Sequence, residues 1–189
     1  MDSIITIARE YASGGRVIAQ KLADTLRIPY YDRQLIELAA KETGLSETYI
    51  EETEQKKTPS LLYNLYVNSK NLPVPDQVFV AQSAIIRRLA SEGPCIILGR
   101  CADYVLRDHK NCLHVFLYAP LEDRVWRARE EYGESLDAAR MMVAKNDRAR
   151  ASYYSHFTAG EWGKCDHYDI CINSSLGVDR VVAAMMALL

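Results

Sequence analysis

A strand, a glycine turn and a helix follow one another directly at the start of the chain, and this succession constrains the fold more than any other feature. Residues 3–8 (SIITIA) are mostly apolar and β-branched, which predicts a buried strand. Ser13-Gly14-Gly15 predicts a tight turn, and apolar residues then recur with helical spacing over residues 17–26. The first 26 residues therefore predict one strand–turn–helix unit.

Short apolar segments alternate with helical patterns along the rest of the chain. Further strands are expected at 28–32, 95–98, 113–117 and 168–173, and further helices at 35–43, 78–90, 122–131, 136–150 and 177–189. Residues 37–54 carry six Glu against one Lys, so we expect an acidic helical stretch that faces solvent. The alternation predicts an α/β fold with a mainly parallel, five-stranded sheet and helices on both faces.

Length and composition favour one globular domain that spans residues 1–189. Apolar residues make up 49% and charged residues 25%, which argues against a disordered chain. The net charge of −2 argues against a long nucleic acid as partner. No apolar run is long enough for a membrane span, and the N-terminus lacks the pattern of a secretory signal. We therefore expect a cytoplasmic protein with no membrane partner.

Cysteine and histidine spacing argues against a disulfide framework and against a metal site. The five cysteines contain no C-x-x-C pair, and the four histidines contain no H-x-x-x-H pair. We therefore expect reduced thiols and no metal held by protein ligands.

Three polar clusters directly follow predicted strands. They are residues 9–16, Asp32-Arg33, and Gly99-Arg100 with Asp103. Ligands of open α/β sheets bind beyond the carboxyl ends of the strands. The sequence therefore predicts a ligand site built from these clusters.

The glycine turn in the first cluster suits phosphate binding. A turn that opens a helix presents unpaired N–H groups and the positive end of the helix dipole, and Arg16 adds charge in the first helical turn. The alternative is that Gly14-Gly15 only makes a tight connection between strand and helix. The local sequence is compatible with both.

Five segments in order resemble cytidylate kinases of bacteria and, more closely, their cytidylate kinase-like relatives. The first is residues 5–23 (ITIAREYASGGRVIAQKLA), which is similar to the phosphate-binding strand, loop and helix of that family. The others are residues 28–32, 97–100, 116–129 and 168–177. The resemblance implies a P-loop NTPase-like three-layer sandwich, with a helical acceptor-binding insert over about residues 33–90 and an arginine-rich lid over about residues 125–160.

The expected phosphate loop departs from the P-loop pattern G-x-x-x-x-G-K-[ST]. Aligned by its flanking strand and helix, Arg9 takes the place of the first Gly, Gly15 that of the Lys and Arg16 that of the Ser or Thr. Shifting the alignment by one residue puts Arg16 at the Lys position and Val17 at the hydroxyl position. Arginine binds phosphate oxygens but cannot bind Mg²⁺, so anion binding is retained while the usual Mg²⁺ hydroxyl is missing in either alignment.

The resemblance implies roles for residues after the second and third clusters. Asp32 aligns with a family aspartate that contacts the nucleoside monophosphate, and Arg100 with an arginine that holds the acceptor phosphate. Cys101 replaces a family aspartate, for which Asp103 is a partial substitute. Asp32 has the alternative interpretation of a helix N-cap, because a helix follows at once.

Arginines on the helix that leads to the expected lid, and in the lid itself, are candidates for binding the transferred phosphate. They are Arg124, Arg127, Arg148 and Arg150. Arg124 and Arg127 share one helix face because they are three residues apart. The alternative is a solvated charged face, and tyrosines such as Tyr153 and Tyr154 have the corresponding alternative of packing rather than stacking on a base.

Together these features predict an ATP-dependent kinase for CMP, dCMP or a related small phosphorylated acceptor. Ser13, Gly14, Gly15 and Arg16 would hold ATP, Asp32, Arg100 and Asp103 the acceptor, and Mg²⁺ would be held mainly through phosphates and water. Two alternatives stay open: a non-catalytic nucleotide- or anion-binding protein, and a small-molecule kinase with another acceptor. Residues 56–77 suit either an acceptor pocket or the surface of a homodimer.

Overall fold

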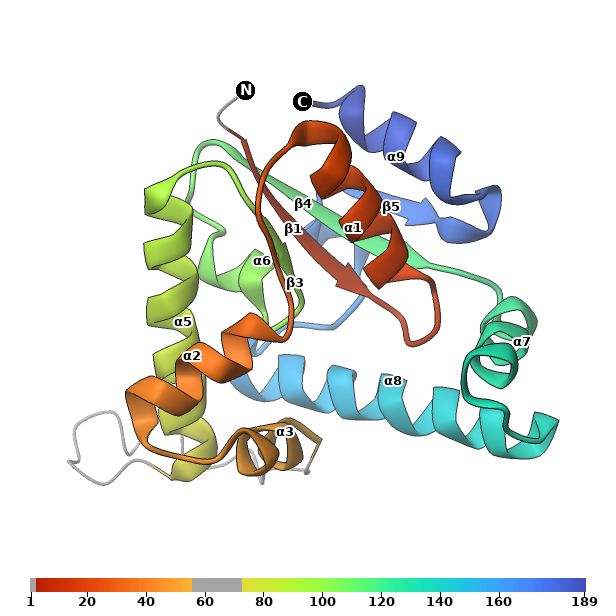
Figure 1. Cartoon of the computed structure of the whole chain (residues 1–189), viewed down its shortest axis with the longest axis horizontal. Coiled ribbons are helices and arrows are strands. Elements are labelled where there is room, and N and C mark those ends of the chain that lie inside the picture. The colour runs from red at the N-terminus through yellow and green to blue at the C-terminus, as the bar shows by residue number, and fades with distance from the viewer. Residues whose placement is uncertain (1–2, 56–72) are drawn as a thin grey trace.

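A parallel five-stranded sheet forms the centre of the computed structural model, which describes residues 3–55 and 73–189 (Figure 1). The strands are β1 (Ile4–Arg9), β2 (Tyr30–Tyr31), β3 (Ile96–Leu98), β4 (Cys112–Tyr118) and β5 (Ile170–Asn173). Their order in the sheet is β2-β3-β1-β4-β5, and every pair is parallel. The predicted parallel α/β sheet is confirmed.

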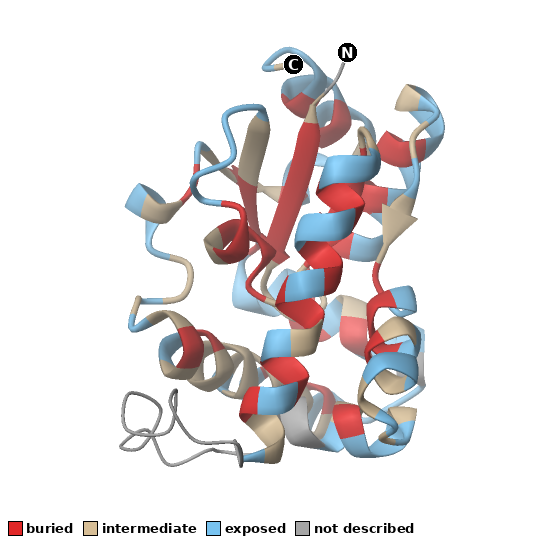
Figure 2. Cartoon of the chain, turned by 90° about the vertical axis from the view of Figure 1, so that its left-hand side faces the viewer, coloured by how far each residue is buried: buried red, intermediate tan, exposed pale blue. Residues whose placement is uncertain are grey.

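Strand β1 lies at the middle of the sheet and is buried along almost its whole length (Figure 2). Its neighbours are β3, with Ile5 opposite Ile96, and β4, with Ile5 opposite Leu113. Side chains of a strand alternate between the two faces of its sheet, so an apolar run such as IITI fits a strand covered on both sides.

Helices α1 (Gly15–Leu26) and α9 (Val178–Met186) cover one face of the sheet (Figure 1). Ile5 and Ile7 of β1 point into this layer together with Leu22 of α1 and Val181 of α9, and all four side chains are fully buried. Of the apolar residues that recur over 17–26, α1 buries Ile18, Ala19, Leu22 and Ala23, whereas Val17 is exposed.

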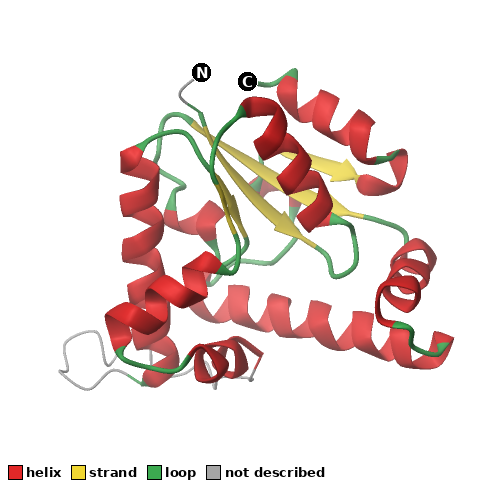
Figure 3. Cartoon of the chain, viewed as in Figure 1, coloured by secondary structure: helices red, strands yellow, loops and turns green. Residues whose placement is uncertain are grey.

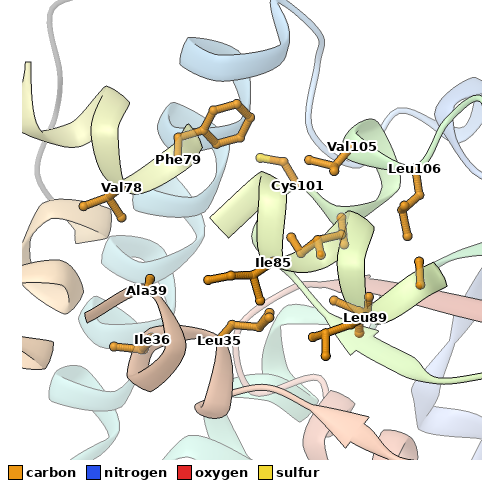
Figure 4. Packing of buried hydrophobic residues seen from close by; sticks show 14 of the residues in the cluster. Leu35, Ile36, Ala39, Val78, Phe79, Ile85, Leu89, Cys101, Val105 and Leu106 are labelled. Carbon is orange, nitrogen blue, oxygen red and sulfur yellow. The ribbon is translucent and has the colours of Figure 1, made fainter. Parts of the chain in front are cut away.

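The opposite face is covered by α2 (Gln34–Thr43), α5 (Val74–Glu92) and the short α6 (Ala102–Val105). Leu35 and Ile36 of α2 pack with Ile85 and Leu89 of α5 (Figure 4). Gly44 ends α2 in the left-handed conformation, as expected from the sequence. The predicted acidic stretch is therefore two helices, α2 and α3 (Glu47–Gln55), because Gly44 interrupts it.

Helices α7 (Leu121–Tyr132) and α8 (Leu136–Thr158) follow β4 and lie beyond the carboxyl edge of the sheet (Figure 3). The predicted end of α8 at residue 150 was wrong by eight residues. The helix continues because Tyr154 and Phe157 are buried in the core next to α5, and it ends at Ala159 in the left-handed conformation.

The remaining differences concern the ends of elements. Helix α5 begins at Val74 rather than residue 78, with Pro75 in its first turn. The expected features of residues 56–72 lie outside the described residues. Over the described ranges, no helix is long and apolar enough to cross a bilayer. All five cysteines are thiols.

Candidate functional site

A cavity of about 410 Å³ lies where β1, β2 and β3 end. Its walls include Arg9 at the end of β1, Asp32 directly after β2, and Arg100 directly after β3. Arg150 of α8 faces it from the other side. The parallel sheet thus brings the three polar clusters together, because parallel strands present their carboxyl ends at one edge.

Asp32 is the centre of a cluster of positive charge. Its carboxylate is buried and lies 2.8 Å from Arg16 Nε, 3.3 Å from Arg100 Nη1 and 3.7 Å from Arg9 Nη2. Burial raises the pKa of Asp32, but the three guanidinium groups outweigh it and hold that pKa below its usual value. Helix α2 begins at Gln34 without a side-chain cap, so the Asp32 carboxylate faces arginines and does not cap the helix.

Arg150 adds a further guanidinium group to the cavity. It lies over the Tyr11 ring at 5.4 Å from the ring centroid. Burial lowers the pKa of Arg150 to about 10. Five arginines thus share the lining with three carboxyl residues, and this excess of positive charge suits a small anion; the arginines are Arg9, Arg16, Arg33, Arg100 and Arg150, and the carboxyl residues Asp32, Glu51 and Asp103.

The loop between β1 and α1 (residues 10–14) has a backbone shaped for anion binding. Ala12 and Gly14 both adopt positive φ angles, of 57° and 79°. The Ser13 hydroxyl is buried and donates to the Glu10 carbonyl at 2.9 Å, which closes the turn. The loop leads directly into α1, whose first N–H groups have no partner within the helix. These N–H groups and the helix dipole are the features that bind phosphate.

Three arginines from α7 and α8 donate to carbonyl groups around this loop. Arg127 Nη1 donates to Ala12 O at 2.6 Å, Arg150 Nη1 to Arg9 O at 2.9 Å, and Arg124 Nη1 to Tyr11 O at 3.4 Å. These bonds hold the carbonyl groups toward α7 and α8.

A buried ionic network fixes the loop to the same two helices. Arg124 Nε lies 3.1 Å from Glu10 Oε2 and donates to Ala119 O at 3.1 Å. Its Nη1 also donates to Asp147 Oδ2 of α8, while Asp147 Oδ1 accepts from the Tyr11 N–H at 2.7 Å. The network joins loop, α7 and α8 into one unit.

Asp103 and Tyr154 form the wall opposite the loop. Both are buried, and the Tyr154 hydroxyl donates to Asp103 Oδ2 at 2.8 Å. Burial raises the pKa of Asp103, and burial with the nearby carboxylate raises the pKa of Tyr154. Among the carboxyl groups that line the cavity, Asp32 and Asp103 thus have pKa values displaced in opposite directions.

The sequence profile of the cytidylate kinase-like family matches residues 4–176, which include the sheet, the loop and both arginine helices. The chain belongs to that family. A search of curated protein sequences found no match.

Solved structures place this cytidylate kinase-like protein among P-loop kinases in fold. An uncharacterized protein from Eubacterium ventriosum ATCC 27560 is 25% identical, with a TM-score of 0.78 over 100% of this chain and 98% of that chain. A shikimate kinase from Bacteroides thetaiotaomicron is 13% identical, with a TM-score of 0.59 over 100% and 98%. A gluconokinase from Sinorhizobium meliloti 1021 is 14% identical, with a TM-score of 0.53 over 96% and 88%. The predicted P-loop kinase fold is confirmed.

The residues predicted for the site fall into three groups in this cytidylate kinase-like structure. Arg16, Asp32, Arg100, Asp103 and Arg150 line the cavity. Ser13, Gly14 and Gly15 form the turn into α1, and Arg124 and Arg127 hold that turn from outside the cavity. Arg148 is exposed on α8 and does not line the cavity.

Sequence reasoning placed Arg9 in the first polar cluster but gave its side chain no role in the site. Aligned with the P-loop pattern, Arg9 counted only as a lost glycine, yet its side chain is 11% exposed and faces Asp32 across the cavity. An arginine at the end of a buried strand was the available signal. Tyr11 and Asn146 also line the cavity, and no spacing pattern indicated them.

The site fits phosphate groups better than it fits a metal ion. Within residues 3–55 and 73–189, no group of three His, Cys, Asp or Glu side chains is arranged to hold a metal. The Ser13 hydroxyl is committed to Glu10 O, and the Asp32 carboxylate to arginines. These residues do not make a Mg²⁺ site of their own, whereas the loop N–H groups and the guanidinium groups suit the phosphates of ATP.

Proposed function

We propose that this protein is an ATP-dependent phosphotransferase that passes the terminal phosphoryl group of ATP to a small anionic acceptor. CMP and dCMP are the first candidates, because of the family to which the chain belongs. The observation that carries the proposal is the cluster of Arg9, Arg16 and Arg100 around Asp32, with Arg150 in the same cavity beside the β1–α1 loop. Phosphoryl transfer depends on positioning and on neutralising charge, and this arrangement provides both.

The donor phosphates would lie against the loop and the start of α1. Ser13, Gly14, Gly15 and Arg16 surround that position, and Arg124 and Arg127 keep the loop carbonyls turned away from it. Preorganised N–H donors need no rearrangement when the phosphate arrives, which is the basis of electrostatic stabilisation in such sites.

The acceptor would lie in the cavity against Arg100 and Asp32. The low pKa of Asp32 makes it a poor proton acceptor at neutral pH. A phosphate acceptor matches this environment, because its oxygen is already anionic and needs no general base. Arg100 would bind that phosphate, and Asp32 would orient both the arginine and the acceptor's polar groups.

Helices α7 and α8 would supply the lid. Arg150 reaches the cavity from α8 and would stabilise charge on the transferred group, while the helices exclude water. Mg²⁺ would be held by the phosphates of ATP and by water, since the protein residues do not form a site for it.

One alternative is favoured by the loop itself. Arg16 stands where the P-loop pattern has the Mg²⁺-binding hydroxyl, so a protein that binds nucleotide or another anion without turnover fits the same cavity.

A second alternative is a kinase that phosphorylates a hydroxyl group of its acceptor. Asp103, with its raised pKa, is a suitable general base in the cavity, and solved structures of this fold include a shikimate kinase and a gluconokinase.

An acceptor panel separates these functions. Purified protein is incubated with ATP and Mg²⁺, and ADP release is measured with CMP, dCMP, UMP, AMP, shikimate or gluconate. The proposal predicts release that depends on a nucleoside monophosphate and is lost in Arg100→Gln, but kept in Arg88→Gln, which removes an exposed arginine of α5. Release only with the hydroxyl acids would favour a hydroxyl acceptor. Nucleotide-dependent thermal stabilisation without ADP release would favour the non-catalytic alternative.

A further inference from the structure

The β1–α1 loop exchanges two residues relative to the P-loop pattern. The pattern places a glycine at the first position and a lysine directly after the second glycine. Here Arg9 stands at the first position and Gly15 at the lysine position. One cation is thus lost at the end of the loop, and another is gained at its beginning.

The Arg9 side chain fills the space that a side chain at position 15 would need. A Cβ atom placed on Gly15 would lie 2.8 Å from Arg9 Cγ and 3.2 Å from Arg9 Cβ. Gly15 does not have a positive φ angle, so its own backbone does not demand glycine. The lack of a side chain at Gly15 therefore follows from the path of Arg9.

The same side chain continues toward Gly99 at the end of β3. A Cβ atom on Gly99 would lie 2.2 Å from Arg9 Nη1. The stem of Arg9 thus passes Gly15 at the start of α1, and its guanidinium group lies against Gly99 at the end of β3. It lines the cavity there, although its side chain begins on β1.

Arg9 shares its nearest carboxylate with two other arginines. Arg9 Nη2 is 3.7 Å from Asp32, which Arg16 and Arg100 approach more closely. Burial, followed by the nearby Arg150, lowers the pKa of Arg9. A buried cation beside other cations is unfavourable unless an anion joins them, so the position is suited to a bound phosphate.

We propose that Arg9 performs the task of the missing P-loop lysine: its aliphatic stem passes Gly15, and its guanidinium group, which lines the cavity, binds the terminal phosphates of the donor. This inference rests on the proposed function for the identity of the donor and adds a catalytic residue to it. An arginine fork binds two phosphate oxygens at once, so the loop retains a donor-phosphate cation without a lysine.

The test measures binding rather than turnover, with inorganic tripolyphosphate and ATP as probes in calorimetric titrations. Arg9→Gln is expected to bind both probes about tenfold more weakly or worse, because a charge-assisted contact is lost. Arg9→Lys is expected to keep most of the affinity, and Arg88→Gln all of it. A folded Arg9→Gln protein that binds both tripolyphosphate and ATP with wild-type affinity would overturn the inference.

A reciprocal exchange keeps the inference testable if Arg9→Gln does not fold. Gly15→Lys alone places a side chain against Arg9 and is expected to weaken tripolyphosphate binding. Adding Arg9→Gly restores the P-loop arrangement and should raise the affinity above that of Gly15→Lys alone. A double variant no better than Gly15→Lys would contradict the inference. This test measures binding and not turnover. If the wild-type protein is inactive in the acceptor panel but Arg9→Gln still weakens the binding of tripolyphosphate, only the proposed function is overturned.

Discussion

The backbone N–H of Tyr11 donates a 2.7 Å hydrogen bond to Asp147 Oδ1, although 136 residues separate the two. The other oxygen of the same carboxylate accepts from Arg124, which also contacts Glu10. One side chain of α8 therefore fixes the loop and neutralises the arginine that spans loop and α7. The shape of the loop depends on a helix that follows it by more than a hundred residues.

Asp147→Asn is expected to lower the free energy of unfolding by about 2 kcal/mol, because Arg124 is 8% exposed and loses a charged partner. Urea unfolding at pH 7 measures the change. Asp108→Asn serves as the control, since Asp108 is 91% exposed and is expected to cost little. Equal stabilities for the two variants would show that Asp147 does not support the loop.

Asp32→Asn is expected to be destabilised at neutral pH, and the deficit should shrink in acid. The folded-state pKa of Asp32 is lowered, so its stabilising effect is present above the unfolded pKa of about 4 and is lost as pH falls through the folded value. Thermal unfolding from pH 7 to pH 3 measures the difference from wild type. Inorganic phosphate should partly restore the variant, because it can join the same arginines. A deficit that is independent of both pH and phosphate would contradict this account.

Asp103→Asn is expected to respond to pH in the opposite direction. Burial raises the folded-state pKa of Asp103, so the ionised group is costly at neutral pH and the wild-type protein gains stability on acidification. The stability of wild type relative to this variant should therefore increase as pH falls from 7 toward 4. The same thermal unfolding experiments as for Asp32→Asn measure this increase. If the stabilities of both variants relative to wild type changed with pH in the same direction, the two pKa values would not be displaced in opposite directions.

Gly99→Ala and Gly44→Ala form a matched pair that isolates the Arg9 contact. Their φ angles are +76° and +74°, but a Cβ on Gly99 meets Arg9 whereas one on Gly44 meets nothing within 4 Å. Gly44→Ala is expected to cost about 1–2 kcal/mol from backbone strain alone. Gly99→Ala should in addition displace the Arg9 guanidinium group, which is the flexible end of that side chain, and should therefore weaken tripolyphosphate binding in a calorimetric titration, whereas Gly44→Ala should not. Equal affinities of the two variants would place the Arg9 guanidinium group elsewhere.

The sequence was sufficient to predict the sheet, because strands covered on both faces are short apolar runs and each is followed by a helical pattern. β1, β3 and β4 lie within one or two residues of their predicted positions. The same alternation predicted which edge of the sheet carries the polar clusters. The carboxyl edge then brought Asp32, Arg100 and Asp103 to one cavity.

The roles of the arginines could not be read from spacing. Arg124 and Arg127 share a helix face, but only the packing of α7 on α8 shows that this face meets the loop carbonyls. Arg9 was hidden for a related reason, because its importance lies in the path of its side chain past Gly15 and Gly99. A motif alignment compares positions along the chain and cannot represent that path.

Transfer of a phosphoryl group in the cavity can be followed by ³¹P nuclear magnetic resonance of ATP, Mg²⁺ and CMP mixed with the protein. We expect the signals of ADP and CDP to grow together, at a turnover on the order of 1–100 s⁻¹. Arg100→Gln should abolish this growth, and Arg88→Gln should leave it unchanged. If neither CMP nor another nucleoside monophosphate gains a phosphate in these spectra, while the protein still binds ATP, the proposed phosphoryl transfer is contradicted.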